Sequence, residues 1–79
     1  MRWITQVVFS LVGRGRGSIV FLVTGGDDAG TLRAYVRATG AFVTLASDVR
    51  TDGLVDLARD GAALVYSGRD GALYLVSTP

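Results

Sequence analysis

Cysteine and histidine are both absent from this chain of 79 residues. The lack of cysteine excludes disulfide bonds and thiol nucleophiles, and the lack of histidine excludes a Ser–His–Asp triad and the commonest nitrogen ligand of zinc. A domain of this size buries only about 60% of the surface that its unfolded chain exposes, so its core supplies little stability. We therefore expect no enzyme, no metal and no cofactor, and we expect association with another chain to complete the core.

Lysine, glutamate and asparagine are absent as well, so every cation is an arginine and every anion an aspartate. The net charge is only +1, which gives no overall nucleic-acid signature. Among lysine, glutamate and glutamine, the polar residues that favour helices, only Gln6 is present. Glycine supplies 11 residues and valine is equally frequent, a composition that favours strands over helices.

Long hydrophobic runs are also missing, although 49% of the residues are hydrophobic. The longest runs, Val7 to Val12 and Ile19 to Val23, are far too short for a membrane-spanning helix. Arg2 precedes an apolar stretch, but no small-residue cleavage site of a signal peptide follows it. We expect a cytoplasmic protein without a membrane partner, in which another chain covers part of the apolar surface.

Turn-forming residues recur at short intervals along the chain and separate runs rich in Val, Leu, Ile, Phe and Tyr. This rhythm predicts a single all-β domain over residues 1–79, with about seven short antiparallel strands in a meander. The expected strands lie near 4–11, 18–24, 31–37, 41–46, 54–58, 62–67 and 72–77.

The alternative is a small α/β domain with helices near 29–39 and 52–60. Leu32, Tyr35 and Val36 fall at helical spacing, and Gly40 would stop that helix. The same segment also alternates as a strand would, with Leu32 and Val36 opposite Tyr35. Under this alternative, Gly25-Gly26 after an apolar run is similar to the turn of a nucleotide site, although the G-x-G-x-x-G pattern is not met.

The chain contains a weak internal repeat. Thr24-Gly25 matches Ser67-Gly68, and Gly30-Thr31-Leu32 matches Gly71-Ala72-Leu73. A period of ~40–45 residues is typical of propeller blades. Here "SGRDGALYLV" resembles the tight turn between the second and third strands of a blade in WD-repeat and TolB-like β-propellers, and "GTLRAYVRATGAFVTL" resembles the third and fourth strands. The Gly-His and Trp-Asp signatures of WD repeats are absent.

The resemblance implies two blade-like repeats, at about 4–46 and 51–77, in a non-enzymatic binding scaffold. Two blades cannot close a ring, so it also implies a homo-oligomer, most simply three copies, or a larger protein partner. We expect Phe21, Leu64 and Tyr66 to lie near buried contacts.

Glycines and arginines alternate from Gly13 to Gly17. Glycines leave backbone N–H groups free to face an anion, and Arg14 and Arg16 add charge, so one hypothesis is phosphate or nucleic-acid binding. The alternative is a flexible hairpin loop whose charges keep a hydrophobic protein soluble. The candidate binding residues are Arg14, Arg16, Asp27, Asp28 and Arg69.

The acidic residues do not form a metal site in sequence. Asp48, Asp52 and Asp56 are spaced too widely for a calcium loop, and Asp27-Asp28 is better suited to capping a turn than to holding a cation. We expect these carboxylates to be solvated, with no metal ligand and no catalytic residue among them.

Overall fold

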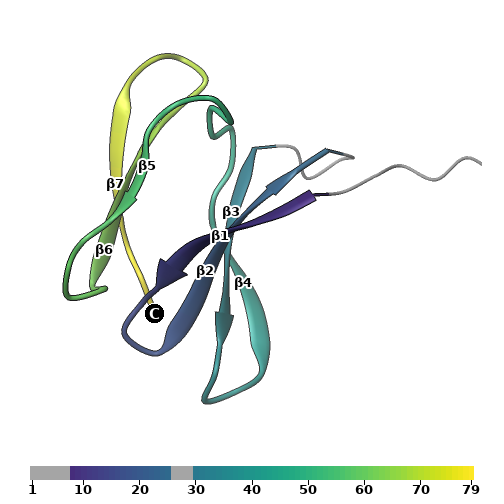
Figure 1. Cartoon of the computed structure of the whole chain (residues 1–79), viewed down its shortest axis with the longest axis vertical. Helices are drawn as coiled ribbons and strands as arrows, with labels where there is room; N and C mark the ends of the chain where they lie inside the picture. Colours follow the sequence, from purple (N-terminus) through teal and green to yellow (C-terminus); the bar gives the residue numbers. More distant parts are fainter. Residues whose placement is uncertain (1–7, 26–29) are drawn as a thin grey trace, which may run out of the picture.

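The computed structural model describes residues 8–25 and 30–79, and in these ranges the chain forms seven strands in two antiparallel sheets (Figure 1). The first sheet has the order β1-β2-β3-β4 and the second the order β5-β6-β7, so each is a meander. The strands are β1 Val8–Arg14, β2 Ser18–Thr24, β3 Thr31–Val36, β4 Ala41–Ala46, β5 Val55–Leu57, β6 Ala63–Ser67 and β7 Leu73–Ser77. The prediction of an all-β meander is confirmed.

The alternative with helices near 29–39 and 52–60 is wrong, since the described residues of both segments are strand and turn. In β3, the buried residues Leu32 and Ala34 alternate with Arg33 and Tyr35, which are only partly covered. A strand here pairs with β2 on one side and β4 on the other, which a helix could not do. Gly40 ends a tight turn instead of a helix, with φ at 71° and its N–H donating to the Val36 carbonyl at 2.8 Å.

The first strand extends further than the expected range of 4–11. It continues through Gly13 to Arg14, with a bulge between Leu11 and Gly13, so the glycine–arginine stretch is half strand and half turn. Residues 4–7 lie outside the described ranges. A Cβ at Gly13 would lie 3.2 Å from Cδ2 of Leu57, so the missing side chain lets β1 approach the second sheet closely.

The core lies between the two sheets. Its buried residues come from both sheets and from the segment that joins them: Val20, Leu22, Leu32, Ala34, Ala46, Val49 and Leu64. Of the three residues expected near buried contacts, Leu64 is buried, Tyr66 packs against the core, and Phe21 lies half-buried on the opposite face of β2. Each sheet therefore gives one face to this core and leaves its other face without a partner sheet among residues 8–25 and 30–79.

The meander sorts the connections between strands to two ends of the molecule. The turn end, as we call it, gathers the turns at 15–17, 37–40 and 58–62 (Figure 1). The loop end gathers Gly30, the segment 47–54 and the turn at 68–72, where the Val49 N–H donates to the Gly30 carbonyl at 2.7 Å. The carboxyl end of the chain lies beside the turn end, where the Pro79 oxygen accepts from the Gly17 N–H at 3.1 Å and from the Ser18 hydroxyl at 3.3 Å.

Candidate binding surfaces

The structure separates the five residues that the sequence singled out. Arg14, at the end of β1, and Arg16, in the following turn, are both exposed at the turn end. Arg69 lies in the turn between β6 and β7, at the loop end. Asp27 and Asp28 fall outside the described residues. Arg14 and Arg16 therefore share a surface that does not include Arg69.

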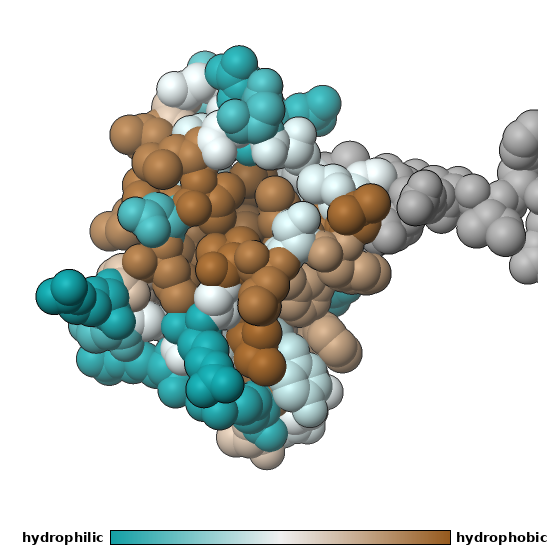
Figure 2. All heavy atoms as spheres, viewed as in Figure 1, coloured by the Kyte–Doolittle hydropathy of each residue, from teal (hydrophilic) through white to brown (hydrophobic). Residues whose placement is uncertain are grey.

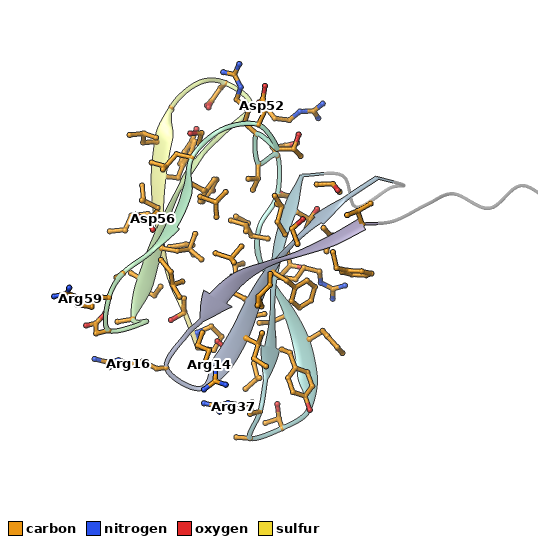
Figure 3. The ribbon with its side chains drawn as sticks, viewed as in Figure 1. Arg14, Arg16, Arg37, Asp52, Asp56 and Arg59 are labelled. Atoms are coloured by element: carbon orange, nitrogen blue, oxygen red, sulfur yellow. The ribbon has the colours of Figure 1, made fainter. Side chains whose placement is uncertain are left out.

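Two further arginines join that surface. Arg37 follows β3 and Arg59 follows β5, and Figure 3 shows both at the same end of the molecule as Arg14 and Arg16. All four side chains belong to exposed residues. We call this set the basic end: Arg14, Arg16, Arg37 and Arg59.

One main-chain hydrogen bond and one close main-chain approach link the three turns of the basic end. The Arg37 N–H donates to the Gly17 carbonyl at 3.0 Å, which joins the turn after β3 to the turn after β1. The turn after β5 approaches closely, because a Cβ at Gly61 would lie 2.8 Å from the Arg14 carbonyl oxygen and 3.0 Å from the carbonyl carbon of Gly15. The arginine side chains take no part in these contacts, so they remain available to a ligand.

Asp60 is the one acidic side chain among the described residues of the basic end, and one of its carboxylate oxygens accepts from the Ala62 N–H at 3.0 Å. The Pro79 oxygen lies at the same end and accepts from the Gly17 N–H. Within the described ranges, the ion pairs lie at the loop end: Arg50 with Asp52 at 2.9 Å, and Arg69 with Asp48 at 4.0 Å. Four arginines on fixed turns can contact several phosphate or carboxylate groups of one polyanion.

The loop end has a different character. Hollows there are lined in one place by Gly30, Arg50 and Asp52, and in another by Asp48, Tyr66 and Tyr74, with Arg69 shared by both. Because the two arginines are matched by nearby aspartates, the part of this end that the structure describes carries no excess of positive charge. The described residues contain no group of three or more acidic side chains that could hold a metal ion.

Two titratable groups of the loop end interact directly. The Tyr74 hydroxyl donates to a carboxylate oxygen of Asp70, and the Ala72 N–H donates to the other oxygen at 3.0 Å. Both bonds stabilise the charged carboxylate, the tyrosine most strongly, and lower the pKa of Asp70 below its usual value. The same bond to Asp70 raises the pKa of Tyr74, because it is lost when the phenol ionises. The pair fixes the turn at 68–72, and the Tyr74 ring stacks on that of Tyr66 with the centroids 5.3 Å apart.

The outer faces of the two sheets form the other distinctive surfaces. On the first outer face, Phe9, Leu11 and Phe42 are more than half exposed, and on the second outer face Leu73 and Leu75 are. Figure 2 shows hydrophobic residues gathered over the second sheet and beside β1, with hydrophilic residues at both ends of the molecule. The described part of the chain includes no helical segment capable of crossing a bilayer.

Comparison with known protein families, with curated proteins and with solved structures found no match.

Sequence reasoning missed Arg37 and Arg59, although a signal for them was present. In a meander of seven strands, the first, third and fifth turns fall at one end. The expected strands already placed Arg37 at the last residue before the third turn and Arg59 in the fifth turn. Each precedes a glycine that ends its turn, Gly40 or Gly61, as Arg16 precedes Gly17. Counting turns would have assembled the basic end before the structure was known.

Proposed function

We propose that the chain is a non-enzymatic interaction module, made of two blade-like repeats, that assembles with further copies through its outer sheet faces and presents its turns to a partner. The observation that carries the proposal is the apolar character of both outer faces. An antiparallel sheet with one solvated face normally alternates apolar and polar residues, so that its outward side is polar. Here, several outward positions in both sheets hold large apolar side chains.

Aromatic side chains form a continuous row on the first outer face. The ring centroids of Phe9 and Phe21 are 5.6 Å apart, those of Phe21 and Phe42 6.0 Å, and those of Phe42 and Tyr35 5.2 Å. The Arg33 guanidinium lies 5.9 Å from the centre of the Phe42 ring. This row crosses all four strands of the sheet, and rigid aromatic groups of this kind are enriched in protein interfaces.

The second outer face is aliphatic. Val65 and Leu75 are cross-strand partners on it, and Leu73 lies one position along the same side of β7. Leu75 is the most exposed of the large hydrophobic residues, at 77%. A larger protein could cover these faces instead of further copies, and the mass of the protein in solution separates the two cases.

Light scattering coupled to size-exclusion chromatography tests the assembly. At micromolar concentration we expect a mass of at least two chains, and a melting temperature that rises with protein concentration because association stabilises the folded state. A mass of one chain together with a melt independent of concentration would show that the chain completes its own core and would refute self-assembly.

A second candidate function is polyanion binding at the basic end, which the convergence of four arginines favours. If all four contact phosphates of a single-stranded oligonucleotide, the logarithm of the affinity should fall with the logarithm of salt concentration with a slope of about −3 (~0.7 per contact). Fluorescence anisotropy measures this slope. Replacing Arg37 and Arg59 with alanine should reduce it by about half.

The matched control replaces two arginines at the loop end, Arg50 and Arg69, with alanine and removes the same charge. These residues are already paired with aspartates, so we expect the salt slope to stay near that of the unmodified protein. Equal loss of binding in the two double variants would show that net charge alone drives the interaction and would exclude a site at the basic end.

A further inference from the structure

We infer that the second outer face of one copy packs on the first outer face of another, in a head-to-tail contact that repeats the packing between the two sheets of a single chain. This inference rests on the proposed self-assembly and specifies which surfaces meet. It follows from a comparison of equivalent positions in the two sheets.

Strand pairing identifies these positions. β2 and β6 are the second strands of their sheets, and their last residues, Thr24 and Ser67, are equivalent in the repeat. Two positions before these ends, Leu22 pairs with Leu32 in the first sheet, and Val65 pairs with Leu75 in the second.

The burial of these two pairs is opposite. Leu22 and Leu32 lie in the core between the sheets, whereas Leu75 is largely exposed on the second outer face. The face that the first sheet turns toward the core therefore corresponds, position by position, to the face that the second sheet turns outward.

The opposite relation holds at the preceding residue of each strand, where the second sheet is buried and the first is exposed. In the second sheet, Leu64 pairs with Leu57 and is buried in the core, at 1% exposure. The equivalent pair in the first sheet is Phe21 with Leu11, and Leu11 is 75% exposed on the first outer face. The face that the second sheet turns toward the core thus corresponds to the outward face of the first sheet, where Leu11 is exposed although Val23 is buried.

The contact inside the chain is therefore heterologous, because the two sheets use opposite faces to make it. Each chain has two outward faces. The first outer face corresponds to the core-facing side of the second sheet, and the second outer face corresponds to the core-facing side of the first sheet. The two outer faces can therefore pack on each other as the two core-facing sides already do. Repeating the contact between copies covers both faces with surfaces of the kind that already pack in the core.

Charge favours this pairing over a symmetric one. The first outer face carries Arg33, whose Nε is buried and has no hydrogen-bond partner among the described residues. The second outer face carries Asp56, the cross-strand neighbour of Val65. Placing two first faces together would oppose arginines, and two second faces would oppose aspartates, whereas the head-to-tail contact brings opposite charges to one interface.

Two variants, each blocked on one face, test the inference. Leu11→Asp places a charge on the first outer face, and Leu75→Asp places the same charge on the second. Both residues are largely exposed in the single chain, so we expect circular dichroism to show that each variant keeps its sheets. Thr51→Asp, at an exposed position of the loop end, is the control and should associate as the unmodified protein does.

Light scattering on each variant alone and on their equimolar mixture gives the result. We expect each single variant to have the mass of one chain and the mixture to contain a species of two chains, because Leu11→Asp keeps an intact second face and Leu75→Asp an intact first face. If one variant alone still forms dimers, or the mixture forms none while the unmodified protein assembles, the head-to-tail contact is wrong although self-assembly stands. A single-chain mass for the unmodified protein would overturn both.

Discussion

The close approach of the turn after β5 to the turn after β1 makes Gly61→Ala an informative substitution. Gly61 has a φ of 74°, a conformation that costs a residue with a side chain about 1–2 kcal/mol. Its new Cβ would also lie 2.8 Å from the Arg14 carbonyl oxygen, whereas ordinary contacts begin at 3.4 Å. The two turns would have to move apart by the difference between these two distances. Crowding of this kind costs a further ~1–3 kcal/mol.

Gly71→Ala is the matched control. Gly71 has a φ of 87°, but a Cβ there would meet no described atom within 4 Å, so it carries the backbone cost alone. In urea denaturation we expect Gly61→Ala to lower the free energy of unfolding by about 2–4 kcal/mol and Gly71→Ala by about 1–2 kcal/mol. Gly61→Ala should also weaken oligonucleotide binding although it removes no charge, because it moves Arg59 away from Arg14. Equal destabilisation by the two substitutions would refute the close packing of these turns.

Two further substitutions test the core and the loop end. Leu32→Ala removes a fully buried side chain from between the sheets and should lower the free energy of unfolding by about 2–5 kcal/mol in urea denaturation; a loss well below ~1 kcal/mol would contradict the sheet packing. Tyr74→Phe should raise the pKa of Asp70 toward that of a free aspartate in a carboxyl-detected NMR titration, and an unchanged titration would rule out their hydrogen bond. Because folding lowers the pKa of Asp70, its contribution to stability is present above the unfolded pKa and is lost as the pH falls through the folded value, so Tyr74→Phe should lessen that acid-induced loss.

Most of the fold could be predicted because turn residues and apolar runs alternate so regularly. The expected strand at 18–24 agrees with β2 at both ends, where Gly17 and Gly25 flank a run of apolar residues. The end of β1 could not be predicted, because Gly13 and Arg14 resemble a loop in sequence and pair as a strand only through a bulge opposite Val20. Such a bulge depends on the neighbouring strand and leaves no local signal.

The local sequence pattern could not decide between helix and strand at 31–39 either. Leu32 and Val36 fit one face of either structure, and the deciding factor is that Thr31–Val36 finds a strand partner on both sides. Only half of the candidate site could be predicted from the sequence, because the other half depends on how the strands pair. Arg14 and Arg16 are adjacent in sequence to glycines and stood out, whereas Arg37 and Arg59 join them only through the order of the strands.

The four arginine side chains of the basic end take no part in the main-chain contacts that hold its turns together. The turns are joined by main-chain groups such as the Arg37 N–H and the Gly17 carbonyl, which any residue other than proline at position 37 would leave in place. We therefore expect that substitution of the side chains at 14, 16, 37 or 59 would change any ligand preference of this end without disturbing the sheets beneath. An assembly of such copies would also display the same weak site several times, so a long polyanion that spans neighbouring copies would be held by avidity even where a single site releases it quickly.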